Sequence, residues 1–365
     1  PPDRQTKTLS PSSIILKSEI ALATERLSFL LSLFFSKRRL VISIFEKKPL
    51  SFCFPNSNLF KTFMLLVLFA LPEPSFSGVV LLYHHVADDT PALTSITTAQ
   101  FERHLKTIEE NGYQVVPLEN LVQTSLASFT LNKKVAITFD DGYKNILTNA
   151  LPLLKKRDWP FTIFVSTKFV GISKSYLSWA DLYYLEQNGA TIGNHTHSHA
   201  HLVRRGDNEV EEEWLARVES EIITAKEILN TNGHNSGVFA YPYGEYNKEV
   251  RDIIRKLGMI GFGQQSGAIG PDSDPLILPR FPLAGAYTGI EALRDKLGSL
   301  AMPLETRYQP PLITENLSPT LLLEFTDPSI RVENVNCFGP GGIMKVSRTS
   351  NTEILIKPKQ ELPVG

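Results

Sequence analysis

The sequence predicts an α/β fold built on a parallel sheet, followed by a small β-rich segment at the C-terminal end. From Gly78 onward, short apolar runs alternate with helical patterns at the rhythm of strands joined by crossover helices. After about Pro303 the helical patterns stop and short strand-like runs follow. An open doubly wound sheet and a closed barrel both satisfy this alternation.

Runs rich in apolar and β-branched residues predict the strands of this sheet. They lie at residues 79–83, 135–139, 161–165, 190–193, 238–241 and 260–263. In the C-terminal segment, the corresponding runs are 320–325, 343–346 and 354–356, with a glycine-rich turn at 339–342.

Helical periodicity fills the intervals between the predicted strands. Thr97 and Thr98 can cap a helix with the apolar face Phe101, Leu105 and Ile108, and Gly112 ends it. Further helices are predicted at 146–154, 182–187 and 248–257. The strongest helical pattern has acidic residues in its first turn and Gly233 just beyond its end. One apolar face of this predicted helix is formed by Val210, Trp214, Val218, Ile222 and Leu229.

Composition sets limits on the function. The 365 residues, 42% of them hydrophobic, suffice for one barrel-sized domain and a smaller piece. Because 37 basic and 38 acidic residues nearly cancel, no basic field favours nucleic acid and no acidic excess indicates disorder. An uncharged glycan is compatible with this balance. Cys53 and Cys337 alone cannot form a metal cluster or a disulfide framework, and such low usage fits both the cytosol and the bacterial periplasm.

The N-terminal part has the features of a targeting sequence. Residues 61–77 combine a lysine, a short apolar run, helix breakers and a small-x-small site, which together predict a signal peptide. The alternative is a buried strand or helix of the mature fold. The run is shorter than the ~20 residues that cross a bilayer, so we expect a secreted or periplasmic protein without a membrane span. Residues 1–60 are interpreted as upstream sequence or as an extended leader. The expected domains are then 78–302 and 303–365.

Polar residues cluster directly after several of the predicted strands. Asp140 and Asp141 follow the strand that ends at Phe139, and His84 and His85 follow the one that ends at Tyr83. Two further clusters, His195 to His199 and Tyr241 to Gly244, follow the strands that start at Ala190 and Val238. The carboxyl ends of parallel strands share one face, where active sites of such folds form. We therefore expect these four clusters to build a single site.

Asp141, His195 and His199 form a plausible metal-binding set, because two imidazoles and one carboxylate leave coordination positions open. Taken singly, the acidic turn and the histidine run have simpler explanations, as a turn and as a solvated loop. On one predicted face, they favour a metal site.

The neighbouring residues would complete a hydrolytic site. Asp140 is free to take a proton from water activated by the metal, and His84 or His85 can donate one to a leaving amine. His197 and His201 are expected behind the ligands or in solvent, whereas His104 and His234 fall on surface patterns.

Residues 138–143 and 195–199 resemble the first two motifs of polysaccharide deacetylases of the NodB-homology type (carbohydrate esterase family 4), and the resemblance covers about Gly78 to Leu300. It implies a distorted (β/α) barrel and a divalent metal, usually zinc, with cobalt or nickel as alternatives. It also implies that Asp140 is the general base and that Asp141, His195 and His199 are the ligands. Residues 239–244 resemble the third motif, in which the backbone N–H of Tyr243 would bind the oxyanion.

The sequence departs from the family pattern at several positions. Ala240 replaces the arginine that orients the base, and Ala200 replaces a proline. Arg280 is predicted to replace the missing arginine and to ionise the base through a charge-assisted bond. No histidine follows His234, although the family's last motif supplies one. Residues 82–86 instead resemble the N-terminal Tyr-His element of the poly-N-acetylglucosamine branch, which would make His84 the general acid.

The predicted function is hydrolytic removal of N-acetyl groups from a polysaccharide that contains N-acetylglucosamine, with an acetylated glycan polymer as partner. One alternative is deacetylation of acetyl-xylan or peptidoglycan. Another is a catalytically silent glycan-binding domain, which the missing arginine would fit.

Overall fold

The computed structural model describes residues 77–127, 133–305, 316–339 and 342–362. The leader at 1–60 and all but the last residue of the predicted signal peptide lie outside these ranges, as do the two central residues of the turn predicted at 339–342. Within them, no helix is both long enough and apolar enough to span a membrane.

The main sheet has eight strands within the described residues, and these strands pair in parallel. Their order is β10-β1-β5-β6-β7-β8-β9, with β4 paired to β5. The strands are β1 (Val79–Tyr83), β4 (Gln114–Val115), β5 (Lys134–Phe139), β6 (Phe161–Val165), β7 (Ala190–Asn194), β8 (Val238–Ala240), β9 (Ile260–Phe262) and β10 (Phe281–Pro282). The six strands predicted from apolar runs are all present, within a residue of the expected ends.

One short segment joins the two ends of this sheet. Leu278 forms a parallel β-bridge with Phe262 of β9, and a few residues later β10 pairs with β1. The sheet therefore curls into a distorted barrel, with the segment from Leu278 to Pro282 between its last and its first strand. The predicted fold class is confirmed, and of the two architectures that the alternation allowed, the structure has the barrel.

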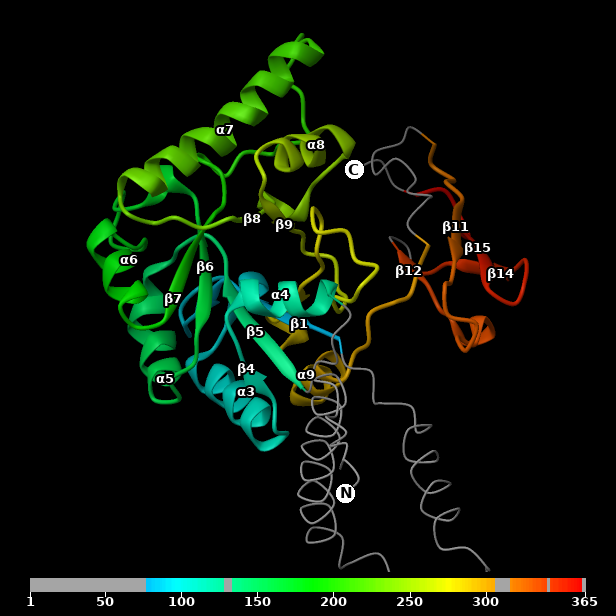
Figure 1. Cartoon of the computed structure of the whole chain (residues 1–365), viewed down its shortest axis with the longest axis horizontal. Helices are drawn as coiled ribbons and strands as arrows, with labels where there is room; N and C mark the ends of the chain where they lie inside the picture. The colour runs from blue at the N-terminus through cyan, green and yellow to red at the C-terminus, as the bar shows by residue number, and fades with distance from the viewer. Residues whose placement is uncertain (1–76, 128–132, 306–315, 340–341, 363–365) are drawn as a thin grey trace, which may run out of the picture. The chain divides into compact units, whose positions relative to one another are not determined.

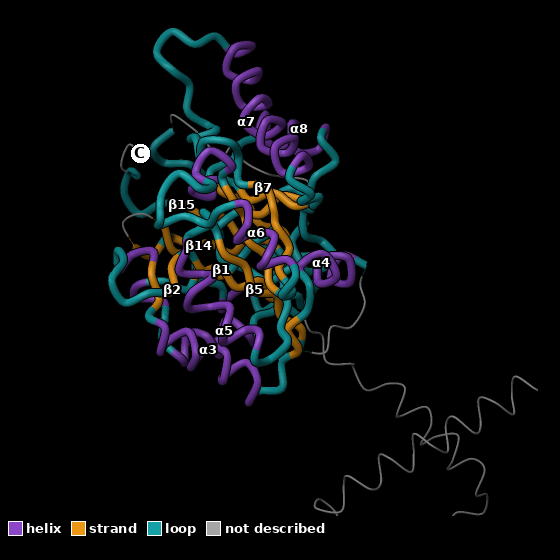
Figure 2. The backbone as a smooth tube through the Cα atoms, turned by 90° about the vertical axis from the view of Figure 1, so that its left-hand side faces the viewer, coloured by secondary structure: helices purple, strands orange, loops and turns teal. Residues whose placement is uncertain are grey.

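Helices surround the strands, as Figures 1 and 2 show. They are α3 (Thr98–Glu110), α4 (Leu118–Leu126), α5 (Leu151–Lys155), α6 (Trp179–Glu186), α7 (Glu211–Thr231), α8 (Lys248–Lys256) and α9 (Ile290–Leu297). The helix predicted at 146–154 begins as a π-helical stretch, Ile146–Ala150, before α5. The sequence pattern does not predict α4 or α9, which are short.

Side chains alternate between the two faces of each strand, as the pleat requires. Val80, Ala136 and Phe164 belong to one buried cluster, to which residues of α4 contribute. Their neighbours Leu81, Ile137 and Ile163 belong to another, with residues of α3, α5 and α6. This alternation places Thr138 and Asp140 on the same face of β5 and its extension as Ala136, inside the barrel.

Two surface assignments and one assignment to an apolar helix face are wrong. His104 is buried between elements, because its Nδ1 pairs with the Tyr83 hydroxyl and its Nε2 with the Thr288 carbonyl. His234 is also buried, with Glu186 as its ion-pair partner. Val210 is the N-cap residue of α7 and is 57% exposed, so it is not part of the apolar face of that helix. In each case the deciding neighbours are distant in sequence or lie at the helix end.

The C-terminal segment is β-rich, as predicted. β11 (Leu321–Glu324), β15 (Glu353–Lys357) and β14 (Lys345–Arg348) form an antiparallel sheet, and β12 (Phe338–Gly339) pairs with β13 (Gly342–Ile343). A small separate cluster of buried residues holds it together: Phe325, Val332, Ile354 and Ile356. The domain boundary at 302–303 stays a prediction.

Candidate active site

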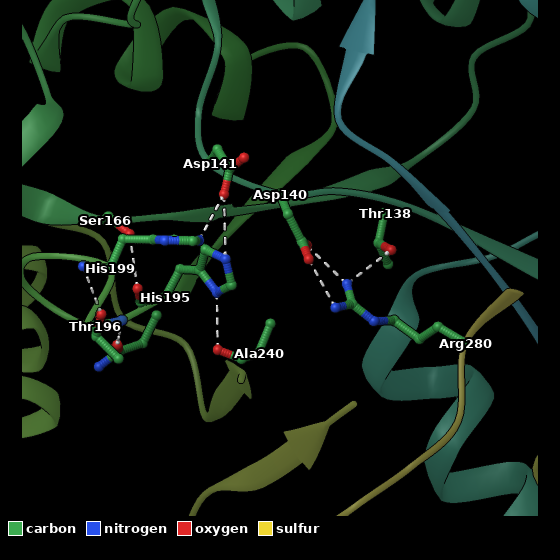
Figure 3. Close-up of polar contacts among 10 residues, drawn as sticks. Thr138, Asp140, Asp141, Ser166, His195, Thr196, His199, Ala240 and Arg280 are labelled. Carbon is green, nitrogen blue, oxygen red and sulfur yellow. Dashed lines mark hydrogen bonds and ion pairs between the residues drawn. The ribbon is translucent and has the colours of Figure 1, made fainter. Parts of the chain in front are cut away.

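The strand ends bring most of the predicted site residues to one end of the barrel. His84 follows β1, Asp140 and Asp141 follow β5, and His195 follows β7. All of these strands are parallel, so their carboxyl ends lie at the same edge of the sheet. Figure 3 shows Asp141, His195 and His199 converging on one point, with Asp140 beside them.

Asp141, His195 and His199 form a compact group of potential metal ligands. One ligand atom from each lies within 4.8 Å of the others. Oδ1 of Asp141 is 3.3 Å from Nε2 of His195 and 3.1 Å from Nε2 of His199. His195 is 1% exposed, whereas about a fifth of the other two side chains reaches solvent (17% and 20%). The group is therefore anchored in the protein and open on one side.

The donor atoms of this group fit a divalent ion. Oδ1 of Asp141 and Nε2 of His195 are buried and have no hydrogen-bond partner. Nδ1 of His195 lies 2.8 Å from the Ala240 carbonyl oxygen, which only accepts hydrogen bonds. The neutral ring must then carry its proton on Nδ1, and the lone pair of Nε2 faces the other two ligands. Buried polar atoms without partners are costly, and a bound cation would satisfy them.

The backbone at this group is strained. Among the described non-glycine residues, seven have a positive φ, and four of them belong to the site: Asp141 (71°), Thr196 (67°), His199 (57°) and Tyr243 (58°). Such conformations cost about 1–3 kcal/mol each and cluster at functional sites. Gly142 follows with φ 75°, and a Cβ there would lie 3.0 Å from Cγ1 of Val165. The Asp-Asp-Gly turn thus needs its glycine, and it directs both carboxylates to the site.

Asp140 is held by Arg280. The guanidinium donates two hydrogen bonds to the carboxylate, Nη1 to Oδ1 at 2.7 Å and Nη2 to Oδ2 at 2.8 Å. Both side chains are 0% exposed. Arg280 is fixed in turn by the Gly263 carbonyl, 2.9 Å from its Nε, and by the Phe164 ring, over which the guanidinium lies. Arg280 immediately precedes β10, so the segment that joins the ends of the sheet carries it into the barrel.

Charges in the site determine its ionisation. Burial would raise the pKa of Asp140, but the adjacent Arg280 and then His195 outweigh it and hold that pKa below its ordinary value. Burial opposes ionisation of Asp141 as well, and its contacts with His195 and His199 lower its pKa more strongly. Both carboxyl groups are therefore ionised at neutral pH. That state suits a proton acceptor and a metal ligand.

The two adjacent histidines have different surroundings. His84 is close enough to Asp140, Asp141, Arg280 and His195 for all four charges to act on it. Burial lowers the pKa of His84, which makes its protonated form a stronger acid, and the two aspartates offset part of that shift. His85 instead stacks on Tyr143, with ring centroids 3.6 Å apart, and its Nδ1 pairs with the Asn145 amide at 2.9 Å. The structure thus brings His84 near the carboxylates and ties His85 to the turn.

Tyr243 lies between two histidines. Its ring stacks on the His201 ring, with centroids 3.8 Å apart. It meets the His199 ring edge-on, with centroids 4.5 Å apart. His201 is held by Glu245, whose Oε2 is 2.8 Å from its Nδ1. Nδ1 of His197 lies 2.9 Å from the Thr167 hydroxyl oxygen. His201 and His197 are therefore held by residues outside the ligand group, and Tyr243 is 48% exposed beside the ligands.

A cleft of about 180 Å³ opens at the metal-ligand group. Its lining is largely aromatic and hydroxyl-bearing: Asp141, Tyr143, Ser166, Phe169, Tyr176, Ser198, His199 and Tyr243. Sequence reasoning missed Ser166, Phe169 and Tyr176 as site residues. Ser166 directly follows β6, so the rule that found the other clusters also applies to it. Phe169 and Tyr176 come from the loop after β6, for which the sequence has no comparable signal.

A comparison with known families identifies one that matches part of this chain. Residues 129–261 match the family model described as polysaccharide deacetylase. That range includes the two carboxylates, the ligand histidines and Tyr243, whereas His84 and Arg280 lie outside it.

Two curated proteins illustrate the relatives. YxkH of Bacillus subtilis (strain 168), named for the same family, is 29% identical over 213 residues, which cover 58% of this chain and 72% of that protein. The poly-beta-1,6-N-acetyl-D-glucosamine N-deacetylase of Staphylococcus aureus (strain MRSA252) is 26% identical over 193 residues, or 51% of this chain and 67% of that protein.

Two solved structures share the fold. The deacetylase PplD of Streptococcus pyogenes, determined with acetate, superposes with a TM-score of 0.55 at 22% identity, covering 61% of this chain and 99% of that one. IcaB of Ammonifex degensii superposes with a TM-score of 0.52 at 24% identity, covering 59% and 95%. At these identities the likeness shows the fold alone, and it agrees with the distorted barrel.

Proposed function

We propose that this chain, which belongs to the polysaccharide deacetylase family, is a metal-dependent hydrolase that removes N-acetyl groups from a polysaccharide containing N-acetylglucosamine. Similarity to polysaccharide deacetylases, one of them named an N-deacetylase, supports a hydrolase of carbon–nitrogen bonds other than peptide bonds. The metal dependence and the polymer are our proposals. One observation carries the metal-dependent hydrolysis: a three-ligand metal group beside a buried aspartate that an arginine keeps ionised.

Asp141, His195 and His199 would hold the ion, with zinc as our first choice and cobalt or nickel as alternatives. A divalent ion bound there would polarise the acetyl carbonyl and acidify water. We assign to Asp140 the removal of a proton from the attacking water, and Arg280 keeps that carboxylate charged and aimed.

The remaining steps use two further groups. The backbone N–H of Tyr243 would donate to the oxygen that becomes negative as water adds to the acetyl carbon. The C–N bond then breaks, and His84 would give its proton to the departing amine. The water oxygen ends in acetate and the sugar keeps a free amino group, so atoms and charges balance.

Three features support a glycan as the substrate. The aromatic lining of the cleft offers flat apolar faces for sugar rings, and its hydroxyl groups offer hydrogen bonds. The near-zero net charge of the chain is compatible with an uncharged polymer. The Staphylococcus aureus relative is named for poly-β-1,6-N-acetylglucosamine. Such a substrate would place the protein outside the cytoplasm, so we keep secretion or a periplasmic location as part of the proposal.

The alternatives remain testable. Acetyl-xylan and peptidoglycan would need the same metal and base and differ only in how the cleft holds the polymer. A silent binding domain is disfavoured, because glycan binding alone has no need of a ligand set together with a charged, buried base. The main argument for a catalytically silent domain was the missing arginine at position 240. The ion pair between Arg280 and Asp140 removes that argument.

The test is acetate release by the full chain from β-1,6-linked N-acetylglucosamine oligomers, chitooligosaccharides, peptidoglycan fragments and acetyl-xylan. Each substrate is tested with Zn²⁺, Co²⁺ or Ni²⁺ and with a chelator. We expect metal-dependent release, fastest from the β-1,6-linked oligomers, and its loss in Asp141→Asn. Asp252→Asn, which removes two surface ion pairs, is the matched control. Binding of oligomers without any acetate release would overturn the enzymatic proposal.

A further inference from the structure

The loop that carries the ligand histidines is fastened to the middle of α7. The Asn194 side-chain amide donates to the Ile222 carbonyl at 2.9 Å, and the His197 N–H donates to the Glu221 carbonyl at 2.9 Å. Ser198 makes two more bonds to the Glu221 carboxylate. Its N–H donates to Oε2 at 2.8 Å, and its hydroxyl donates to Oε1 at 2.7 Å.

The two bonds from Ser198 differ in kind from the others. The acceptors at Ile222 and at the Glu221 backbone are helix carbonyls, which any residue would supply. The carboxylate belongs to one side chain on α7, and both of its oxygens bind the residue that immediately precedes His199. Bonds to a charged acceptor are roughly twice as strong as neutral ones, so this attachment dominates the side-chain contacts of Ser198.

The loop needs such an attachment because its backbone is unfavourable. Thr196 and His199 both have left-handed φ angles, 67° and 57°, although neither is glycine. Within the loop, the Thr196 hydroxyl accepts from the His199 N–H at 3.0 Å. A strained segment keeps its conformation only where surrounding groups over-determine it. Fixing Ser198 fixes the direction in which His199 leaves the loop towards Asp141.

We propose that Glu221 is a positioning residue for the metal group, acting through Ser198 to hold His199 in its ligating direction. The inference rests on the proposed metal-dependent function, because it concerns the same three ligands. Glu221 does not line the cleft and is outside the ligand group, so it touches neither substrate nor metal. Its effect should therefore appear in metal affinity before it appears in substrate binding.

The experiment compares Glu221→Ala and Glu221→Gln with the wild-type chain. Co²⁺ binding to the metal-free protein is followed by calorimetry and by its visible absorption. Loss of partners that orient metal ligands typically costs 10- to 100-fold in affinity, so we expect about that weakening for Glu221→Ala. Glu221→Gln should stay within a few-fold of wild type. Its amide oxygen can accept from the Ser198 N–H, and its NH₂ group can donate to the hydroxyl oxygen.

Glu219→Ala is the matched control. Glu219 lies on the same helix and pairs with Lys256 on the surface, at 2.7 Å. Its loss should leave Co²⁺ affinity unchanged. The thermal midpoints of the metal-free proteins are measured alongside, and Glu221→Ala and Glu219→Ala should differ little. Excess metal should restore most of the acetate release of Glu221→Ala, with KM unchanged.

The outcomes separate this inference from the function beneath it. If the wild-type chain binds no Co²⁺, both the proposed metal-dependent function and the role of Glu221 are refuted. If wild type binds Co²⁺ and Glu221→Ala binds it equally tightly, the role of Glu221 is refuted while the function stands. A loss of affinity that Glu221→Gln does not rescue, together with a lower metal-free midpoint, would mean a purely structural role and would also refute it.

Discussion

Replacing Arg280 with methionine tests the base of the site most directly. The substitution keeps an apolar stem of similar length inside the barrel and removes the guanidinium. Asp140 then loses both charge-assisted bonds, at 2.7 and 2.8 Å, and stays 0% exposed. Arg280→Lys is the companion variant, because lysine restores the charge without the two parallel N–H donors.

The size of the effect follows from the burial of both partners. Removing one member of a buried ion pair leaves an uncompensated charge and costs about 3–5 kcal/mol. Domains of this kind have a total stability of roughly 5–15 kcal/mol, so the variant should still fold, with a clearly reduced free energy of unfolding. Arg294→Ala, which removes only a surface pair with Glu291, should change stability by less than about 0.5 kcal/mol.

The pH dependence has a definite sign. In the wild type, the pKa of Asp140 is depressed, so its contribution to stability is present above the unfolded value of about 3.9 and is lost as pH falls through the folded value. Without Arg280, burial dominates and the pKa of Asp140 rises. The loss of stability should then shrink as pH is lowered, because the protonated carboxyl is cheaper to bury. A general base must be ionised, so the acidic limb of acetate release should move to higher pH.

The assays are urea unfolding of the metal-free protein at several pH values and the pH profile of kcat/KM for acetate release. The expected order of stability and activity at neutral pH is wild type, then Arg280→Lys, then Arg280→Met. Unchanged turnover and an unmoved acidic limb in Arg280→Met would refute the assignment of Arg280 as the partner of the base. A stability loss that is constant from pH 4 to pH 8 would refute the electrostatic reasoning.

Three further predictions concern the metal, the acid and the scaffold. A chelator should abolish acetate release and lower the thermal midpoint, and added Zn²⁺ should restore both; activity that survives complete metal removal would contradict the ligand assignment. His84→Gln should lower kcat by about 10²- to 10⁴-fold, the usual share of general acid catalysis, whereas His85→Gln should lower it much less. Equal losses would count against His84 as the acid. Thr97→Ala removes the capping box of α3 and should cost about 1 kcal/mol in urea unfolding, with the partly exposed Thr124→Ala as control. No difference between the two variants would show that the cap is dispensable.

Long-range closure of the fold was harder to predict than its elements. Apolar runs such as Phe161–Val165 identify strands by themselves, because every side chain in them is buried. Closure of the barrel depends on the segment from Leu278 to Pro282, where one bridge and a two-residue strand suffice. Such a segment has no periodicity to detect. α4 and α9 were also missed, although their lengths of nine and eight residues equal those of α8 and α6, which were predicted.

The same contrast holds for the site. Positions shortly after two parallel strands, β5 and β7, were enough to predict that Asp141, His195 and His199 meet, and the structure places one ligand atom of each within 4.8 Å of the others. Their roles, and those of Asp140, His84, Arg280 and Tyr243, remain predictions that the experiments above test. Contacts made by side chains from helices could not be predicted. Glu221 is one of many acidic residues on α7, and only the folded loop distinguishes it from Glu219.

The departure at position 240 shows how the barrel tolerates a change in its motif. Ala240 belongs to the interior cluster that includes Phe164, and the guanidinium of Arg280 lies over that same ring. Because the strands of a small barrel share one interior, the long side chain of Arg280 reaches Asp140 from the segment before β10. The backbone of Ala240 still serves the site, since its carbonyl fixes the His195 ring. The partner of Asp140 thus comes from the segment before β10, whereas the contact that orients the His195 ring comes from β8.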